Sequence, residues 1–509
     1  MLVDDKICAV VAASKASEMQ RQLSQAVRHT HTVEVRLDWL RSEVEIDRFV
    51  GQLGRHAARP VTFIATCRRT KAGGRYRGSI GKQLLHLAEA IRAGCTWYDL
   101  EIETIRECPP ELLEALLGDG RQLRSAHYFR HLPGNLSLVA QELKRGDPQA
   151  IKIAAHCDSL AEANKLAEFA SRHRNVIAIP MGEVALPARI LALRAKNGFA
   201  YAPVENATAA GQTSLAELSK LYRADRINRQ TRVYGVIGNP ISHSLSPAMH
   251  NRAFAARRIN AIYLPFLVGD LRDFLDSVDR LGIDGFSVTL PHKETIMKYL
   301  DGCDPLAARI GAVNTVTVRG PGHLYGYNTD YVGVLRTLER RVRLPASRVL
   351  VLGAGGAARA VAFALAQAGS RVCVSARRWD KAKALAGAVD GEAIERAKLR
   401  GEFFDAIINA TPVGMYPAME NSPLEARELN CRLVFDTIYR PHRTRLIELA
   451  QRRGIETVSG LEMFVWQGSA QWEIWTRGRA PIRVMRQAVI DALAREGTLV
   501  RKGSTRNPR

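Results

Sequence analysis

Paired cysteines, long apolar runs and a surplus of acidic residues are all missing from this sequence. Its eight cysteines are scattered without a C-x-x-C pair, which argues against a disulfide framework and against a zinc ribbon. Asp4 and Asp5 precede a short apolar stretch, unlike a signal peptide. Glycines and Arg359 interrupt the apolar residues 351–368, so we expect no membrane span. These features predict reduced thiols in a cytoplasmic protein.

Basic residues outnumber acidic ones, and the formal net charge is +22. Such a charge raises nucleic-acid binding as a possibility. However, no basic block is interleaved with aromatic residues, and no nucleic-acid module is recognisable. Anionic small substrates explain the charge adequately. The 509 residues predict roughly three domains.

The segment RVLVLGAGGAARA, residues 348–360, predicts a phosphate-binding turn. A buried parallel strand would run into a glycine turn and then into a helix, whose N-terminus favours an anion. Gly353 would permit the tight turn and Gly355 the close approach of a pyrophosphate. The predicted cofactor-binding residues of this turn are Gly353, Ala354, Gly355, Gly356 and Ala357.

The next predicted strand, residues 371–375, ends in Arg377 and Arg378 rather than in an acidic residue. An acidic residue there would hold a ribose 2′-hydroxyl, whereas two guanidinium groups suit a 2′-phosphate. We therefore favour NADP over NAD, with a solvated basic turn as the alternative.

From Ile7 to about Tyr222 the sequence alternates eight times between strand-like and helix-like segments. The expected strands are residues 7–12, 32–37, 61–66, 97–101, 122–126, 150–154, 176–181 and 199–204. Eight such units in about 220 residues favour a TIM barrel, with an open doubly wound sheet as the alternative.

A barrel places its active site at the carboxyl ends of its strands. The reactive residues expected there are Glu34, Arg36, Arg68, Glu101, His127 and Lys152. Lys152 lies between Ile151 and Ile153, and an ammonium in apolar surroundings loses solvation and becomes a nucleophilic amine. A snorkelling lysine is the alternative, but His127 on the neighbouring strand favours a Schiff-base lysine with an acid/base partner.

Seven short motifs in the first half resemble those of the type I 3-dehydroquinate dehydratases. They are VEVRLD, Arg68 followed by Gly73-Gly74, YDLE, SAHYF, IKIA, LPARI and ATAAGQ. The resemblance implies that Lys152 forms an imine with the substrate ketone and that His127 moves protons. It also implies substrate binding by Glu34, Arg36, Arg68, Arg189, Thr208 and Gln212.

Three positions depart from that family pattern. Ala72 replaces the usual Glu before the paired glycines, Thr208 replaces the usual Ser, and Tyr128 stands where a small polar residue is common. The loss of a carboxylate near His127 would lower its basicity.

Residues 222–231 are polar and unpatterned and predict a linker. Beyond it, Ser244 and Ser246 precede Pro247 at a predicted helix start, where they either cap the helix or bind a carboxylate. Lys293 and Asp330 follow strands and could exchange a proton with a hydroxyl or a ketone, with an exposed salt bridge as the alternative. Thr289 and Asn314 add neutral groups that orient a polyol.

Residues 232–495 resemble shikimate dehydrogenase through GNPISHSLSP, GFSVTLPHKE, GAVNTV, GYNTD, the glycine turn, Asn409-Ala410-Thr411, FDTIY and SGLEMFVWQGSAQW. The resemblance implies that Lys293 and Asp330 are the catalytic pair. The implied substrate-binding residues are Ser244, Ser246, Thr289, Asn314, Tyr439 and Gln467. Thr411 and Gly460, with the glycine turn, Arg377 and Arg378, would bind NADP(H). Ser287 departs from the usual Asn.

Together the two resemblances imply a bifunctional enzyme that acts on small carboxylates: 3-dehydroquinate, 3-dehydroshikimate and shikimate. No metal, nucleic acid or membrane is required. The implied parts are a dehydratase barrel (1–225), a linker (226–231), a substrate-binding domain (232–340), a Rossmann-type NADP domain (341–459), returning helices (460–497) and a basic tail (498–509). The alternatives are a quinate or shikimate dehydrogenase that works oxidatively, and a basic binding protein on an inactive barrel.

Overall fold

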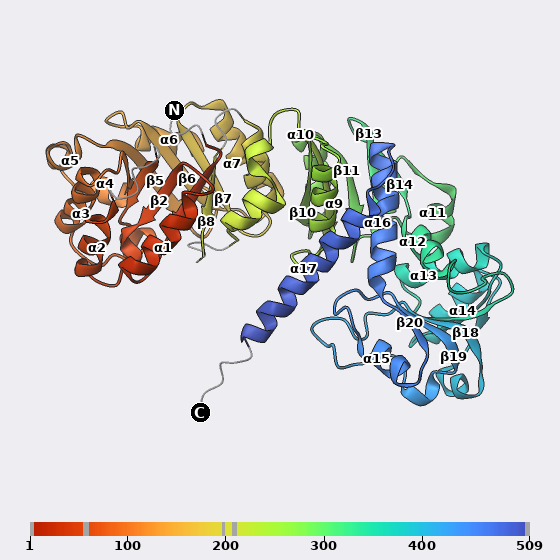
Figure 1. Cartoon of the computed structure of the whole chain (residues 1–509). Helices are drawn as coiled ribbons and strands as arrows, with labels where there is room; N and C mark the ends of the chain where they lie inside the picture. The colour runs from red at the N-terminus through yellow and green to blue at the C-terminus, as the bar shows by residue number, and fades with distance from the viewer. Residues whose placement is uncertain (1–4, 54–60, 196–198, 206–210, 504–509) are drawn as a thin grey trace. The chain divides into compact units, whose positions relative to one another are not determined.

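The computed structural model of the chain describes residues 5–53, 61–195, 199–205 and 211–503 (Figure 1). Contacts divide the chain into two compact units, Met1–Thr231 with Phe266–Leu281, and Arg232–Pro265 with Gly282–Arg509. Among the described residues, no helix combines the length and apolar character needed to cross a bilayer. All eight cysteines are unpaired.

Eight parallel strands, coloured from red to yellow in Figure 1, form the sheet of the first unit. They are β1 (Ile7–Val11), β2 (Thr32–Arg36), β3 (Thr62–Thr66), β4 (Trp97–Glu101), β5 (Arg121–Tyr128), β6 (Ala150–His156), β7 (Val176–Met181) and β8 (Ala200–Pro203). The sheet order is β7-β6-β5-β4-β3-β2-β1-β8, so the last strand lies beside the first. This order confirms the expected barrel over the open sheet.

Helices connect these strands, as in a (β/α)8 barrel, with two of them, α4 and α5, between β4 and β5. They are α1 (Ala16–Ala26), α2 (Glu43–Val50), α3 (Ile80–Arg92), α4 (Ile102–Glu107), α5 (Pro110–Leu117), α6 (Leu136–Leu143), α7 (Leu160–Arg172) and α8 (Leu186–Leu191). Ser42, Ser79, Asn135 and Ser159 cap α2, α3, α6 and α7 by accepting from backbone N–H groups. The helix starts therefore follow the ordinary capping preferences.

The alternation of β6 decides where Lys152 points. Ile151, Ile153 and Ala155 pack in one apolar cluster with helix residues such as Leu166. Because successive side chains of a strand face opposite sides, Lys152 faces the interior of the barrel. It is buried there, with 3% of its surface exposed.

After the barrel the chain forms a mixed sheet in the order β10-β9-β11-β13-β14-β12. Its strands are β9 (Arg232–Gly238), β10 (Ala261–Leu267), β11 (Ile283–Val288), β12 (Gly302–Cys303), β13 (Thr315–Gly320) and β14 (His323–Tyr327). The helices that follow these strands are α9 (Ser246–Ala256), α10 (Leu271–Leu281), α11 (Pro305–Ile310) and α12 (Asp330–Leu338). The end of β10 and all of α10 belong to the first unit by their contacts, and the other elements belong to the second. Pro247 lies in the first turn of α9, as expected.

A second sheet of six parallel strands follows, in the order β17-β16-β15-β18-β19-β20. Its elements are β15 (Arg348–Leu352), α13 (Gly356–Gln367), β16 (Arg371–Ser375), α14 (Trp379–Gly387), β17 (Glu392–Ala393), β18 (Phe404–Asn409), β19 (Cys431–Asp436), α15 (Arg445–Arg452) and β20 (Glu456–Val458). Numbered within this sheet, the order is 3-2-1-4-5-6, the order of a dinucleotide-binding Rossmann fold.

The apolar run of β15 is explained by burial on both faces of this sheet. Val349 and Val351 pack in one core cluster, whereas Leu350 and Leu352 pack in another. A parallel strand covered on both sides reads as a continuous apolar run.

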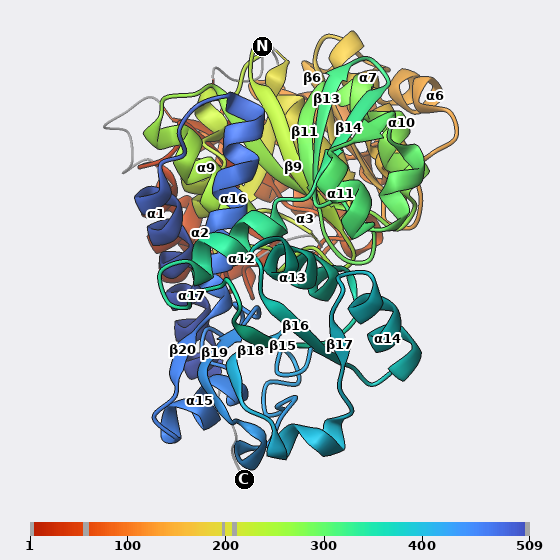
Figure 2. The ribbon, with the colours of Figure 1, turned by 90° about the vertical axis from the view of Figure 1, so that its right-hand side faces the viewer.

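Two helices end the described chain, α16 (Gly460–Thr476) and α17 (Ile482–Gly503). Figure 2 shows α16 beside α12. A Cβ atom at Gly333 of α12 would lie 2.8 Å from the carbonyl oxygen of Met463. The absence of a side chain at Gly333 therefore permits the close approach of the two helices.

Candidate active sites

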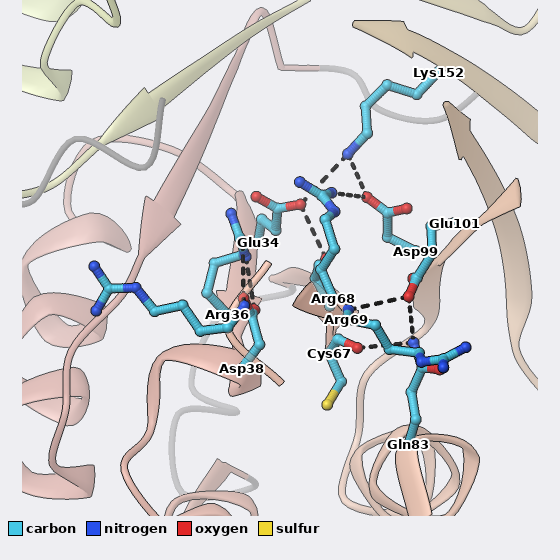
Figure 3. Close-up of polar contacts among 12 residues, drawn as sticks. Glu34, Arg36, Asp38, Cys67, Arg68, Arg69, Gln83, Asp99, Glu101 and Lys152 are labelled. Atoms are coloured by element: carbon cyan, nitrogen blue, oxygen red, sulfur yellow. Dashed lines mark hydrogen bonds and ion pairs between the residues drawn. The ribbon is translucent and has the colours of Figure 1, made fainter. Parts of the chain in front are cut away.

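Lys152 lies among charged side chains inside the barrel (Figure 3). Its Nζ donates a hydrogen bond to Asp99 Oδ2 and lies 3.5 Å from Glu34 Oε1. The ring of Tyr201 lies 4.6 Å from the same nitrogen. The expectation of apolar surroundings is therefore wrong, because Ile151 and Ile153, the neighbours in sequence, face the helices.

Asp99 joins the two cations of the site. Its Oδ2 also accepts from Arg68 Nη2 at 3.0 Å, and the carboxylate is 1% exposed. Burial alone would raise the pKa of Asp99, but the charges of Lys152 and Arg68 hold that pKa below its usual range. Asp99 is thus an ionised carboxylate between two cations.

The imidazole of His127, at the carboxyl end of β5, is held in its neutral form, whereas Asp99 is held in its charged form. Burial, together with the charges of Arg68 and Lys152, holds the pKa of His127 well below its usual range. The ring is therefore neutral at neutral pH and can accept a proton. His127 Nδ1 has no hydrogen-bond partner in the described residues.

Glu34 and Arg36 come from β2 and both lie inside the barrel. Glu34 Oε1 accepts from Thr66 Oγ1 at 2.9 Å. Arg36 donates two hydrogen bonds of 2.9 Å to the carboxylate of Asp38, and despite its burial this carboxylate raises the pKa of Arg36. Arg36 is therefore a fixed, permanent cation.

Glu101 contacts the protein scaffold rather than the interior cluster (Figure 3). Its Oε1 accepts from Gln83 Nε2 at 2.9 Å, from Thr104 Oγ1 at 3.1 Å and from the backbone N–H of Arg69 at 3.1 Å. We expected a reactive group at this strand end, but the carboxylate instead anchors the start of the loop after β3.

Arg189 and Gln212 line one cavity together with Tyr201, the aromatic neighbour of Lys152. Arg189 donates to the carbonyl oxygens of Pro180, at 2.9 Å, and Gly211. Burial lowers the pKa of Arg189 to about 10. Thr208, the remaining expected residue of this site, lies outside the described residues.

Lys293 and Asp330 meet in the second unit. Lys293 Nζ donates to Asp330 Oδ2 at 2.6 Å, and Asn314 Nδ2 donates to Asp330 Oδ1 at 2.8 Å. The lysine side chain is 20% exposed and the aspartate side chain 9%. Both carboxylate oxygens are therefore occupied, and the ammonium remains reachable from solvent.

A chain of hydrogen bonds leads from Asn314 to residues that the sequence did not single out. Thr315 Oγ1 donates to Asn314 Oδ1 at 2.8 Å, and Gln471 Nε2 donates to Thr315 Oγ1 at 3.1 Å. Gln471 Oε1 accepts from Ser287 Oγ at 3.0 Å, and Ser287 lies 2.6 Å from the Tyr263 hydroxyl. Ser287 stands where the family pattern usually has Asn, and its hydroxyl is held by these two partners.

The two predicted serines lie at the start of α9. Ser246 is buried and its side chain hydrogen-bonds Tyr263. Ser244 Oγ accepts from the Ser246 N–H at 3.3 Å. The chain of contacts through Tyr263 therefore connects Ser246 with Asp330. Thr289 lies directly after β11, where its N–H donates to Ile237 O at 3.0 Å.

The glycine turn fits a pyrophosphate. Gly353 has φ +111°, and a Cβ there would lie 3.0 Å from the carbonyl oxygen of Ala410. A Cβ at Gly355 would meet nothing within 4 Å, and no side chain caps the N-terminus of α13. The space beside Gly355 and the uncapped N–H groups are what a bound phosphate needs.

The turn also lies near the lysine of the second site. A Cβ at Gly356 would lie 3.9 Å from the carboxylate of Glu294, the residue after Lys293, and 3.9 Å from Ala312 Cβ. A dinucleotide on this turn is therefore close to the segment that carries Lys293.

Arg377 and Arg378 are exposed after β16, and neither forms an ion pair within the described chain. Their guanidinium groups are thus accessible to an anion. Thr411 Oγ1 donates to Asn409 Oδ1 at 2.7 Å after β18, which pairs with β15. A Cβ at Gly460 would lie 2.2 Å from Thr437 O, so no other residue fits the start of α16.

Two further predicted residues lie on or against α16. Tyr439 stacks on Phe464 with ring centroids 4.5 Å apart. Gln467 Nε2 donates to Phe464 O at 2.9 Å, whereas Gln471, one turn later, enters the hydrogen-bond chain to Asp330. The missed Gln471 was visible in the sequence as a same-face neighbour of Gln467.

Three family models match the chain. They are "Type I 3-dehydroquinase" over residues 7–229, "Shikimate dehydrogenase substrate binding domain" over residues 236–316, and "Shikimate 5'-dehydrogenase C-terminal domain" over residues 460–490. The chloroplastic bifunctional 3-dehydroquinate dehydratase/shikimate dehydrogenase of Arabidopsis thaliana is 32% identical in an alignment of 500 residues that covers 93% of this chain and 82% of the relative. The chain belongs to this bifunctional family.

Relatives of the second half alone are also similar. The shikimate dehydrogenase (NADP(+)) of Moorella thermoacetica is 44% identical in an alignment of 283 residues that covers 53% of this chain and 96% of that protein. A solved shikimate dehydrogenase in complex with NADP+ has 40% sequence identity and a TM-score of 0.50, and covers 52% of this chain and 97% of its own. Both relatives match the second half of this bifunctional family member, and the solved structure has the same fold there.

Asp99 also acts on His127 in this member of the bifunctional family. Its charge raises the pKa of His127, against the larger effects of burial and of the charges of Arg68 and Lys152. Asp99 Oδ1 is buried and has no hydrogen-bond partner in the described residues. The charge of Asp99 therefore acts on His127 as well as on Lys152 and Arg68.

Proposed function

We propose that the chain catalyses two consecutive steps, the dehydration of 3-dehydroquinate to 3-dehydroshikimate and the reduction of 3-dehydroshikimate to shikimate with NADPH. The bifunctional name of the Arabidopsis relative supports this proposal. The observation that carries it is the presence of two separate lysine–aspartate pairs, one inside the barrel and one in the second unit.

In the barrel, Lys152 Nζ attacks the ketone carbon of the substrate after it passes a proton to a neighbouring carboxylate. Glu34 Oε1, 3.5 Å from Nζ, is an acceptor within reach, whereas the lowered pKa of Asp99 keeps that carboxylate ionised. Loss of water gives an imine, which acidifies the adjacent C–H bond. A lysine buried beside Glu34 therefore has the proton acceptor that this step requires.

His127 is the base for the elimination. Its neutral imidazole takes the proton from the acidified carbon and returns it to the departing hydroxyl, which leaves as water. Hydrolysis of the imine then frees Lys152. Glu34, Arg36, Arg68, Arg189, Thr208 and Gln212 bind the hydroxyl groups and the carboxylate of the substrate.

In the second unit, Lys293 donates a proton to the ketone oxygen as the ketone is reduced. Asp330 holds the ammonium at 2.6 Å, and Asn314 holds the other oxygen of Asp330. Ser244, Ser246, Thr289, Tyr439 and Gln467 complete the substrate-binding residues. NADPH, when bound, supplies the hydride for this step.

The chain's own residues suit NADP. Gly353, Ala354, Gly355, Gly356 and Ala357 would accept the pyrophosphate, and Thr411 and Gly460 would border the cofactor. Arg377 and Arg378 are exposed cations without ion-pair partners in the described chain. Two such guanidinium groups favour a 2′-phosphate over a free hydroxyl.

We further propose the division into parts that the sequence suggested, with the dehydratase in residues 1–225 and the dehydrogenase in residues 232–497. The unpaired cysteines suit a reducing compartment, and we place the protein in the cytoplasm.

Trapping Lys152 tests the proposal most directly. Borohydride added with 3-dehydroquinate reduces an imine to a stable amine, and mass spectrometry of the peptide that contains residue 152 detects the adduct. Lys152→Ala should abolish dehydration and spare shikimate oxidation, whereas Lys293→Ala should do the reverse. Absence of the adduct in the wild-type chain, or loss of both activities from either change, contradicts the two-site proposal.

A further inference from the structure

Three potential metal ligands meet outside the catalytic sites, on the helix layer of the barrel. They are Asp47 of α2 and His86 and Glu89 of α3, and one ligand atom of each lies within 4.8 Å of the others. His86 and Glu89 are three residues apart, so they share one face of α3. Asp47 approaches that face from the neighbouring helix.

His86 is the unusual member of this cluster. Its side chain is 91% buried because only 9% is exposed, yet neither ring nitrogen has a hydrogen-bond partner in the described residues. Tyr76 contacts the ring edge-on at 5.8 Å between centroids. Buried polar groups normally have partners. Both ring nitrogens of His86 are therefore open to a ligand from outside the protein.

The two carboxylates are available to share such a ligand. Glu89 Oε2 lies 3.7 Å from His86 Nδ1, which is too long for a hydrogen bond. Asp47 is exposed, and its carboxylate forms no hydrogen bond or ion pair with another side chain of the described residues. Both side chains can therefore rotate toward the imidazole.

We propose that Asp47, His86 and Glu89 bind a divalent transition-metal ion, for which Zn²⁺ has the best chemistry. Zn²⁺ accepts imidazole nitrogen and carboxylate oxygen, and three protein ligands leave a fourth position for water. Mg²⁺ instead prefers an octahedron of oxygens. Ligands of a tetrahedral Zn²⁺ are about 3.4 Å apart at bond lengths of about 2.1 Å, so rotation of the exposed carboxylates closes the site.

The ion would fasten α2 to α3. The same helix α3 carries Gln83, whose Nε2 donates to Cys67 O at 2.8 Å and to Glu101 at 2.9 Å, next to the predicted catalytic end of β3. The ion would therefore stabilise the part of the barrel that supports this loop. This site has no role in either chemical step, and it stands independently of the proposed function.

The test is a Zn²⁺ titration of the full-length protein after treatment with a chelator. We expect one saturable equivalent, and about a ten-fold or greater loss of affinity in Asp47→Asn and in Glu89→Gln, since each removes one charged ligand. Both residues are exposed, so neither change disturbs the core. Glu111→Gln, an exposed carboxylate on α5, is the matched control and should bind Zn²⁺ as the wild type does.

Thermal unfolding gives a second measurement, because an ion that binds only the native state raises the midpoint. Zn²⁺ should raise the midpoint of the wild type and the control but not that of the two ligand variants, and Mg²⁺ should leave all four unchanged. Anomalous scattering from Zn²⁺ between the three side chains would locate the ion. The proposal is overturned if the wild type binds no equivalent, or if both variants bind it with unchanged affinity, which would place the ion elsewhere in the protein.

Discussion

The replacement of Asp330 by Asn tests the second site most sharply. The carboxylate accepts from Lys293 at 2.6 Å and from Asn314 at 2.8 Å, so both of its oxygens face donors. An amide offers only one oxygen, and its NH₂ group would face the other donor. The charge and one hydrogen bond are therefore lost together, although the shape of the side chain is kept.

The size of the effect follows from the geometry. At an effective dielectric constant of about 20, two charges 2.6 Å apart attract by roughly 6 kcal/mol. Lys293 is one-fifth exposed, so solvent screens part of this attraction, and about 3 to 4 kcal/mol is a reasonable remainder. If the pair acts in the transition state, kcat for reduction should fall by about 100- to 1000-fold.

The assay follows the loss of NADPH absorbance at saturating 3-dehydroshikimate, with the dehydratase rate of the same preparation as an internal reference. Glu402→Gln is the matched control, since it breaks an ion pair of 2.5 Å with Arg348 at the start of β15, and it should leave kcat unchanged. A change of less than ten-fold in Asp330→Asn, with a normal dehydratase rate, would mean that Lys293 and Asp330 form only a structural salt bridge.

Three other outcomes follow from the charges of the two sites. Arg377→Ser combined with Arg378→Ser should raise KM for NADPH by about 100-fold through the loss of charge-assisted hydrogen bonds, and an equal rise for NADH would contradict the 2′-phosphate assignment. The dehydratase kcat/KM should stay high as pH falls below about 6.5, because burial and the charges of Arg68 and Lys152 keep the pKa of His127 low. A fall of kcat/KM that begins at or above that pH would exclude His127 as the base. Asp99→Asn leaves Lys152 and Arg68 without their shared carboxylate, so calorimetry should show the barrel destabilised by about 3 to 5 kcal/mol while shikimate oxidation continues.

The sequence predicted the strands well because local patterns determine them. The observed strands Trp97–Glu101, Val176–Met181 and Arg371–Ser375 have the predicted bounds, and the others differ by a few residues at their ends. The glycine turn could also be predicted from the sequence, because only glycine takes the φ of +111° at residue 353 at little cost.

The contacts inside the sites were harder to predict, because they depend on which strands lie side by side. Lys152 was expected among apolar residues, but strand alternation sends Ile151 and Ile153 to the helices. Asp99 was not among the residues predicted from the sequence. It lies two residues before Glu101 on β4, and side chains two residues apart on a strand lie on the same face. Gln471 joins Asp330 through Thr315 and Asn314. Its position on the same helix face as Gln467 can be read from the sequence, but the packing of α16 on β13 that this route requires cannot.

The two lysines differ in a way that fits their proposed roles. Lys152 is 3% exposed and lies beside the carboxylates of Asp99 and Glu34, so a proton that leaves it must pass to a protein group before the amine can attack. Lys293 has one carboxylate partner among the described residues and a side chain that is 20% exposed, so it can recover from solvent the proton that it gives to each ketone. A nucleophile needs an internal proton acceptor, whereas a proton donor needs an external supply. The burial of each lysine therefore argues against exchanging the two assignments.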